Sequence, residues 1–403
     1  MLPLLVCSFW AVVLLVDWQR QSGCAACGHL CLWAAAAAVL YGCHVVFFSQ
    51  SMNWVVGADM VYVAVNLAVF PLYLDYLSRL TRGSSLLRSE RTLFLPPVLI
   101  GLLVATLYVL MDVAERQQFV YTYLYNNSFS GLSGLMLMQA WLHHAAKLIF
   151  ALGVFVVLIK GRHMVADYHR MVDNLYADTE EKSLHGISTL FMLVVAVSLA
   201  SLIANVVGRH VFVGSHLLAL PSLLFSSLLF ALAYMGSRQQ FGYDNIAESE
   251  KLSVPETDEN VQCQMRSDDG LDGQNSDAGE SKAECCSGVD SSNKEYQRKQ
   301  LLANEFEQLM TDEQLYLMPG LKVADVAVKL NTNVRYVQQA TNEILGVSFA
   351  EYVNRRRIDY AKQIMKTSPD LSAVEVALRS GFSSSSSYYS NLKRYGGGKK
   401  NKG

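Results

Sequence analysis

The sequence lacks the short motifs that mark common enzyme chemistry. It has no His-Glu-x-x-His pair for a zinc protease, no glycine-rich phosphate loop and no Gly-x-Ser-x-Gly turn for a serine nucleophile. The last apolar run, 211–235, has no lysine, which excludes a pigment that holds retinal as a Schiff base. We therefore predict no catalytic residues, no metal site and no cofactor, and we do not expect an enzyme.

Cysteine is also scarce, with 8 residues in the chain. Cys24, Cys27, His29 and Cys31 are spaced as metal ligands often are, but no second pair occurs in the loops. We favour small residues that pack well, and a metal or redox role is the alternative.

Charge is low and apolar residues are abundant, at 17% and 52% of the chain. Such a composition is unusual for a soluble protein. A helix that rises about 1.5 Å per residue needs roughly 17–25 apolar residues to cross about 30 Å of hydrocarbon. Seven runs are candidate spans: 2–16, 30–49, 54–77, 93–114, 134–159, 185–207 and 211–235.

The run 2–16 is the shortest of the seven. A secretory signal peptide begins with positive charge, and Met1-Leu2-Pro3 carries none. We interpret this run as a short spanning helix. If it does not span, six helices remain and the C-terminus stays on the same side.

The basic residues of the connections predict the orientation, because cytoplasmic loops carry an excess of Lys and Arg. One side has Arg116 and Arg209, whereas the other has ten basic residues. The ten are Arg20, Arg79, Arg82, Arg88, Arg91, Lys160, Arg162, Arg170, Lys182 and Arg238. This imbalance predicts a multi-pass membrane protein with its C-terminus in the cytoplasm.

Charge divides the rest of the chain. The stretch 241–297 has fourteen Asp or Glu against four Lys or Arg, whereas 298–403 has sixteen basic against ten acidic residues. The acidic stretch contains almost no aromatic residues and cannot bury enough apolar surface to fold. We predict a transmembrane sensor region at 1–238, a disordered acidic linker at 239–297 and a basic helical domain at 298–403.

The basic domain contains the pattern of a helix-turn-helix motif. Residues 321–330 form the first helix with Ala327 at the helix contact, Asn333 is a natural N-cap, and Val337 docks the second helix, which runs to about Ile344. The exposed face of the second helix would carry four side chains that can bond base edges: Arg335, Gln338, Gln339 and Asn342. The alternative is an ordinary solvated helix face.

A second copy of the pattern follows. Ala377 precedes Gly381 by four residues, and a helix with Tyr388, Tyr389, Leu392, Lys393 and Arg394 comes next. Between the copies, 349–365 has apolar residues at helical spacing and predicts a connecting helix.

The two copies together resemble the AraC/XylS family of bacterial transcription regulators over about the last hundred residues. The resemblance is carried by six segments: Gly346-Val347-Ser348-Phe349, Tyr352-Val353-Asn354-Arg355, Arg357-Ile358, Ala361-Lys362, Val376-Ala377 and Gly381-Phe382-Ser383-Ser384. It implies two helix-turn-helix motifs that enter successive major-groove segments of double-stranded DNA. It also implies base contacts by Arg335, Gln338 and Gln339 in the first motif and by Ser386, Ser387 and Ser390 in the second.

The chain departs from this family at two places. Serines fill positions 383 to 387, and serine discriminates poorly between bases, so we expect Ser384, Ser385, Ser386 and Ser387 to hold phosphate with Lys393 and Arg394. A low-complexity turn is the alternative. The glycine- and lysine-rich end, 396–402, replaces the family's usual Gly-x-Thr-Pro segment and predicts looser packing under the second motif.

Three consecutive arginines lie on the connecting helix, and helix geometry prevents them from facing one partner. We expect Arg355 and Arg356 to contact phosphate and Arg357 to pair internally with Asp359 or Glu351.

Ionisable and polar groups inside the apolar runs are costly and are therefore candidates for function. The predicted topology puts seven of them toward the outer half: Asp59, Asp112, His143, His144, Lys147, Asn205 and His216. We consider a polar signal site that opens outward, and alternatively an internal ion-pair network such as Asp59 with Lys147.

These observations predict an all-α protein that joins a seven-helix transmembrane bundle to a cytoplasmic DNA-binding domain. Its function would be to couple a signal at the membrane, a small molecule or a protein, to sequence-specific DNA binding, with a homodimer as one means. Proteolytic release of the domain is another means. The rival hypothesis is a seven-helix receptor or transporter whose tail is a helical protein-docking domain.

Overall fold

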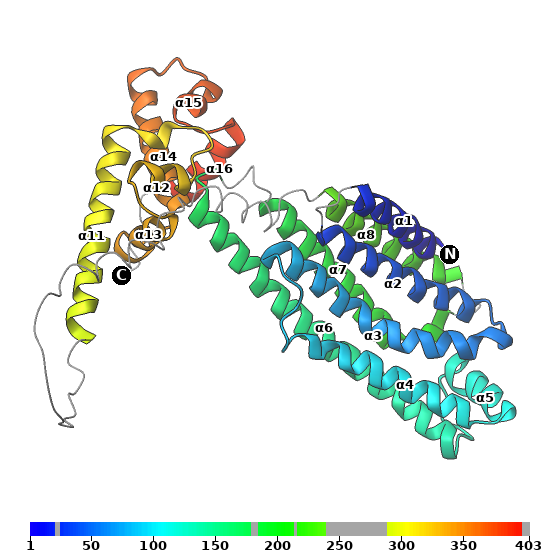
Figure 1. Ribbon diagram of the computed structural model, residues 1–403. Helices are drawn as coiled ribbons and strands as arrows, with labels where there is room; N and C mark the ends of the chain where they lie inside the picture. Colours follow the sequence, from blue (N-terminus) through cyan, green and yellow to red (C-terminus); the bar gives the residue numbers. More distant parts are fainter. Residues whose placement is uncertain (21–24, 179–183, 213–215, 239–287, 397–403) are drawn as a thin grey trace, which may run out of the picture. The chain divides into compact units, whose positions relative to one another are not determined.

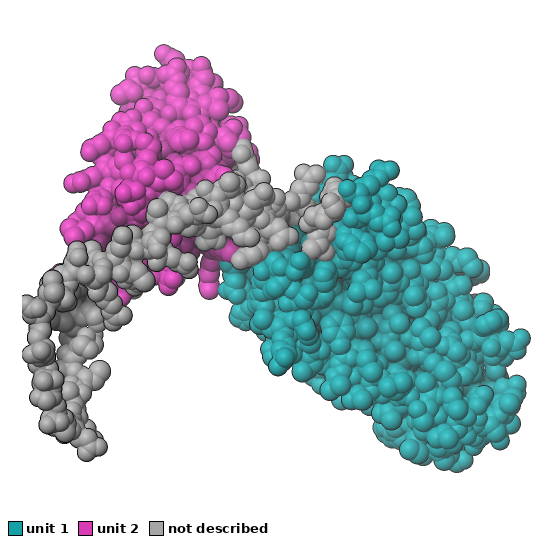
Figure 2. All heavy atoms as spheres, viewed as in Figure 1, with its two compact units in different colours: residues 1–168, 183–244 teal, residues 169–182, 245–403 magenta. Residues whose placement is uncertain are grey.

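The computed structural model describes residues 1–20, 25–178, 184–212, 216–238 and 288–396. The chain divides into two compact units (Figure 2). The first, called the bundle below, comprises 1–168 and 183–244. The second, called the C-terminal unit, comprises 169–182 and 245–403. The end of helix α6 therefore belongs to the C-terminal unit, although most of this helix lies in the bundle.

The described residues include seven helices that are long and apolar enough to cross a membrane. They are α1 (Leu2–Arg20), α2 (Ala25–Phe48), α3 (Met52–Arg82), α4 (Leu95–Leu110, preceded by the 3-10 turn η1 at Arg91–Phe94), α6 (Gly134–Leu175), α7 (Leu184–Val207) and α8 (Ala219–Arg238). Helix α2 packs against α1 and α3, α3 packs against α4, and α8 packs against α1 and α7 (Figure 1). The predicted seven-helix bundle is confirmed.

The bundle is built for an apolar surrounding. Large apolar side chains such as Leu102, Leu110 and Val206 are exposed on its outside, whereas Asp59 and Gln139 are buried inside. This is the arrangement expected where lipid replaces water, because polar groups then find their partners within the protein. Helix α1 has 19 residues, which gives a rise of about 28 Å and makes it longer than the predicted run.

Two predicted spans include residues that belong to separate short elements. Helix α4 ends at Leu110, because Asp112 is the N-cap of a separate helix, α5 (Val113–Phe119), which continues into the π-helical turn η2 (Val120–Tyr125). Helix α8 begins at Ala219 rather than at 211. The 3-10 turns η3 (Arg209–Phe212) and η4 (His216–Leu218) come before it.

The C-terminal unit is all-helical in its described part, apart from one isolated bridge between Tyr176 and Lys322. Its elements are α11 (Gly288–Asp312), the 3-10 turn η5 (Leu315–Leu317), α12 (Val323–Lys329), α13 (Val334–Gln339), the π-helical turn η6 (Ala340–Ile344), α14 (Phe349–Thr367), α15 (Ala373–Arg379) and α16 (Ser385–Tyr395). Helix α14 is amphipathic and buries Phe349, Val353 and Ile358 in the core.

Helix α11 begins at Gly288, so residues 288–297 are helical and do not belong to the predicted linker. Further along the helix, inside the predicted domain, Ala303, Phe306 and Met310 form a buried stripe at helical spacing. Phe306 packs edge-on against Tyr352 of α14, with ring centroids 4.9 Å apart. The rest of the predicted linker, 239–287, and the tail 397–403 lie outside the described residues, as does Cys24 of the cysteine cluster.

Candidate DNA-binding interface and membrane cavity

The first helix-turn-helix motif has the predicted geometry. Ala327 of α12 and Val337 of α13 are 1% and 0% exposed, as expected where the two helices touch. The N-cap is confirmed, because the Asn333 side chain accepts a hydrogen bond of 3.0 Å from the backbone N–H of Arg335. The second helix continues through η6 to Ile344. The pattern of small, capping and docking residues therefore predicted this motif correctly.

The outer face of this second helix, the first recognition helix, carries unpaired polar side chains. Arg335 and Asn342 are exposed, and Gln338 and Gln339 are half-buried. Within the described part of the chain, none of these four side chains makes a hydrogen bond or an ion pair. Arg binds guanine and Gln or Asn binds adenine through donor and acceptor patterns in the major groove. The helix thus presents free groups of the type that direct base contact requires.

The second motif is built on α15, a turn at Gly381 and α16. Ala377 and Phe382 are fully buried, and with Ile358, Ala361 and Tyr388 they form one apolar cluster. Gly381 has a φ of +83°, and a Cβ atom there would lie 2.7 Å from the carbonyl oxygen of Leu317. Only glycine fits this turn without strain. Ser384 is the N-cap of α16, since its side chain accepts a hydrogen bond from the backbone N–H of Ser387.

Some of the serines around the start of α16 are exposed to solvent, and one is buried in the core. Ser384, Ser386 and Ser390 are exposed, and Ser385 is half-buried. Ser387 is 3% exposed, which makes it a wrong prediction for a DNA contact. Residues that are three or four positions apart share a helix face, and Ser387 shares the inner face with Asn391, whose side-chain amide donates to its carbonyl oxygen at 2.9 Å.

The basic residues near the motifs differ in whether their side chains already have partners within the protein. Lys393 is exposed and has no partner among the described residues. Arg355 is exposed but pairs with Glu351 one turn earlier, and Arg356 donates to the Tyr352 hydroxyl oxygen at 3.1 Å. Arg394 lies 3.5 Å from the Asp173 carboxylate. Lys393 is therefore the cation in this group that is free to meet a phosphate.

Arg357 pairs internally, as predicted, but the expected partners Asp359 and Glu351 are wrong. Its guanidinium is 0% exposed and forms an ion pair with Asp178, which lies in the connection after α6. Its other two nitrogens donate to the carbonyl oxygens of Tyr316 at 2.6 Å and Met318 at 2.8 Å. Burial lowers the pKa of the guanidinium, and the charge of Asp178 opposes this change. Each of the three guanidinium nitrogens thus has an acceptor, and such partners stabilise a buried charge.

Three residues after α6 form what we call the docking segment: Tyr176, Ala177 and Asp178. All three are buried within the C-terminal unit. The Ala177 N–H donates to the carbonyl oxygen of Leu321 at 3.0 Å, and its carbonyl oxygen accepts from the Asn354 side chain at 2.8 Å. The second carboxylate oxygen of Asp178 accepts from the Gly320 N–H at 2.6 Å. The segment is thus bonded to the start of α12 and to the middle of α14.

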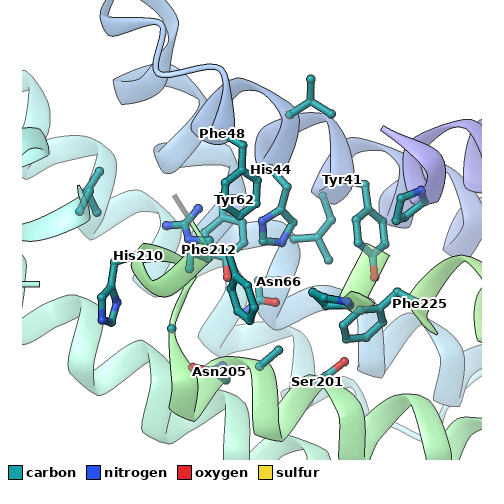
Figure 3. A pocket seen from close by; sticks show the side chains of 18 of the residues that line it. Tyr41, His44, Phe48, Tyr62, Asn66, Ser201, Asn205, His210, Phe212 and Phe225 are labelled. Carbon is teal, nitrogen blue, oxygen red and sulfur yellow. The ribbon is translucent and has the colours of Figure 1, made fainter. Parts of the chain in front are cut away.

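The bundle contains a cavity of about 460 Å³. Figure 3 shows side chains of α2, among them Tyr41, His44 and Phe48, on one side, with Asn205 of α7 and Phe225 of α8 facing them. The wall also includes Ser49 at the end of α2 and Gly208 after α7. The cavity therefore lies toward the end of the bundle where α2 and α7 end and α3 and α8 begin.

A buried carboxylate lies behind the cavity wall. Asp59 is 2% exposed, and its oxygens contact His143 Nε2 at 2.7 Å, the Tyr108 hydroxyl at 3.0 Å and an Arg209 nitrogen at 3.0 Å. The predicted pair of Asp59 with Lys147 is therefore wrong. Arg209 also lies over the rings of Phe47 and Tyr62, with its central carbon 4.2 Å and 3.9 Å from the ring centroids.

The seven predicted signal-site residues do not all meet. His143, Lys147 and Asn205 line the cavity, with Asp59 directly behind it. Asp112 instead caps α5, and His216 lies in η4 outside the wall. His144 is also outside the wall and bonds the Tyr123 hydroxyl at 2.9 Å.

Sequence reasoning missed Arg209 and His44, which line the cavity. The charge count of the connections includes Arg209 only as a loop cation that sets the topology. Arg209 is one of only two basic residues in the connections on its side of the membrane. This rarity was the signal that could have identified it as a candidate functional residue.

Comparison with family models matches residues 326–397 to a helix-turn-helix domain of the AraC type. The match runs from α12 to the end of α16 and so includes both motifs described above. The C-terminal domain is an AraC-type DNA-binding domain of the AraC/XylS family of transcription regulators. Comparisons with curated proteins and with solved structures gave no match. The chain is thus a DNA-binding regulator that also carries seven apolar helices of membrane-spanning length.

Proposed function

We propose that this chain is a membrane-integrated transcription regulator that couples a signal received by the bundle to sequence-specific binding of double-stranded DNA. In this proposal the bundle lies in the inner membrane of a bacterium and the DNA-binding domain lies in the cytoplasm, which is supported by the excess of basic residues in the connections on that side. The cavity then lies toward the outer side. Arg335, Gln338, Gln339 and Asn342 contact bases, while Ser384, Ser386, Ser390 and Lys393 hold phosphate.

The proposed coupling is supported by the position of helix α6 in the chain. This one helix contributes His143 and Lys147 to the cavity region, and the docking segment directly after it is bonded to α14 and to the start of α12. A ligand that favours one position of α6 also acts on the docking segment through the covalent chain. A ligand shifts such an equilibrium by its difference in affinity for the two states.

Pairing of two chains is part of the proposal. Two DNA-binding domains in one membrane meet two neighbouring DNA sites at a high effective concentration, and this multiplies the affinity without any new contact. A signal that changes the position or the pairing of the domains therefore changes occupancy at the promoter.

The first test is selection of DNA from a random library by the full chain in nanodiscs at two salt concentrations. We expect enrichment of one sequence, with affinity falling steeply as salt rises, because each phosphate contact releases counterions. Enrichment of no sequence by a folded protein contradicts sequence-specific regulation.

The second test addresses the coupling, with Asp178→Asn as the variant and Asp359→Asn as the matched control. Asp359 is exposed and pairs only with Lys362 among the described residues. We expect Asp178→Asn to alter the output of a reporter promoter while the selected DNA sequence stays the same. Unchanged output and signal response in this variant exclude the docking segment as the link.

A further inference from the structure

The charges on the cavity wall are unbalanced. Among the described residues the wall contains the basic side chains of Lys147 and Arg209 as well as three histidines, and no aspartate or glutamate. The carboxylate of Asp59 lies behind the wall and compensates Arg209. Lys147 has no ion pair or hydrogen bond within the described part of the chain. A protonated Lys147 therefore gives the cavity a positive charge that no carboxylate among the described wall residues balances.

Arg209 also retains donors for a ligand. A guanidinium has five N–H donors, and the Asp59 carboxylate accepts from one nitrogen of Arg209. The side chain remains 18% exposed and lines the cavity. Its plane is fixed between the rings of Phe47 and Tyr62, so the donors that remain are held in one orientation.

The remainder of the wall is largely apolar and aromatic. Phe48, Phe150, Phe212 and Phe225 line it together with aliphatic residues of α1, α2 and α3. Figure 3 shows Phe225 and Tyr41 near each other on the opposite side of the cavity from His210. A volume of about 460 Å³ lies within the range of small-molecule sites, roughly 300–1,000 Å³.

We propose that the cavity binds an amphiphile with one anionic headgroup, a long-chain carboxylate of the fatty acid class. Its carboxylate meets Lys147 and the free donors of Arg209, and its tail lies along the aromatic wall. Charge pairing with a guanidinium favours a planar carboxylate, and the apolar wall favours a hydrocarbon tail. This inference rests on the proposed function, since it names the class of ligand that the bundle receives.

Other ligand classes fit the wall less well. A cationic ligand would approach two basic side chains, and no carboxylate among the described wall residues would receive it. A sugar would lose water from many hydroxyl groups against aromatic rings that offer few partners, which is costly. A neutral hydrocarbon would leave the Lys147 amine unpaired in an apolar site.

The test measures binding of radiolabelled oleate to the full chain in phosphatidylcholine nanodiscs, without DNA. Lys147→Gln removes the charge, Lys147→Arg restores it, and Lys160→Gln is the matched control. Lys160 lies on the same helix but outside the cavity wall, 3.3 Å from Glu90. Thermal unfolding of each variant shows that it is folded.

We expect saturable oleate binding that Lys147→Gln weakens about tenfold, equivalent to about 1.4 kcal/mol, and that Lys147→Arg and Lys160→Gln preserve. Oleyl alcohol, which has the same tail without the charge, should compete poorly. Equal competition by the alcohol, or unchanged affinity in Lys147→Gln, overturns the proposal.

Two further arms separate the alternatives. Displacement of oleate by phosphatidylglycerol in the nanodisc would show that the site takes a phosphate headgroup of a bilayer lipid and would overturn the fatty acid assignment, whereas persistence of oleate binding supports the free acid. Because the assay contains no DNA, the ligand inference can hold even if DNA selection fails, and the reverse is also true.

Discussion

At the scale of single residues, specificity depends on a few side chains that the fold leaves without partners. Arg335 and Gln338 project from the first recognition helix and make no hydrogen bond among the described residues. A base edge can therefore bind them without breaking an internal bond. Serine, which occupies the corresponding positions in the second motif, gives little discrimination. The first motif accordingly carries most of the base recognition in our proposal.

Alanine substitutions test whether the first motif recognises bases while Lys393 of the second contacts phosphate. We expect Arg335→Ala and Gln338→Ala each to cost about 1–3 kcal/mol of binding to the selected sequence and to relax specificity. Lys393→Ala should weaken binding to selected and random DNA alike, because it removes a phosphate contact. Binding titrations of the full chain in nanodiscs measure both effects.

Lys362→Ala is the control for these titrations, because Lys362 pairs with Asp359 on α14 and is not among the proposed contacts. Equal losses on selected and random DNA for Arg335→Ala, Gln338→Ala and Lys393→Ala would show that the first recognition helix does not recognise bases.

At the scale of elements, the turn of the second motif depends on one close approach. The Gly381 Cα lies so near the backbone of η5 that a side chain at this position would clash with Leu317. Because Leu317 also precedes Met318, whose carbonyl oxygen bonds Arg357, a shift here would reach the buried ion pair. The turn, η5 and α14 therefore act as one packed group.

Gly381→Ala should destabilise the C-terminal unit by about 1–3 kcal/mol, through a left-handed backbone and a steric clash together. Gly346→Ala is the matched control. Gly346 has a φ of +67°, but no other atom lies within 4 Å of the place that a Cβ atom would take, so this variant isolates the backbone effect. Denaturant unfolding, followed by circular dichroism, measures both variants, and equal losses would show that the clash at Leu317 is unimportant.

The sequence predicted elements well where local patterns determine them. Local packing requires a small residue at Ala327, the helix start requires an N-cap at Asn333, and the turn requires a glycine at Gly381. These three local requirements were enough to predict both helix-turn-helix motifs. Long apolar runs likewise predicted the seven helices. The end at Asp112 was predicted poorly because a capping box competes with hydropathy there, and the helix start at Gly288 was missed.

The partners of charged residues were the least predictable part of the candidate sites. Arg357 and Asp178 are 179 positions apart, and Asp59 and Arg209 are 150 apart. Helical spacing shows only neighbours three or four positions away, which is why Asp359 and Glu351 were the expected partners. The burial of Ser387 was missed for a related reason. Five consecutive serines give no hydrophobic pattern that shows which face of the helix packs against the core.

At the scale of the whole molecule, the AraC-type domain is not complete in its own sequence segment. Its buried arginine takes a carboxylate partner from the connection between α6 and α7, and Asn354 takes a carbonyl partner from the same place. Removing one partner of a buried ion pair typically costs about 3–5 kcal/mol. The fragment 288–403 therefore lacks contacts on which the domain depends.

A synthetic peptide of residues 169–178 should restore those contacts. We expect it to raise the melting temperature of fragment 288–403 in a concentration-dependent way, because a ligand that binds only the folded state stabilises it by mass action. The matched peptide with Asp178→Asn cannot offer a charge to Arg357 and should raise the melting temperature much less. Differential scanning fluorimetry over a peptide titration measures the difference. Equal shifts from the two peptides would show that the ion pair contributes little, and no shift from either would show that the docking segment does not hold the domain.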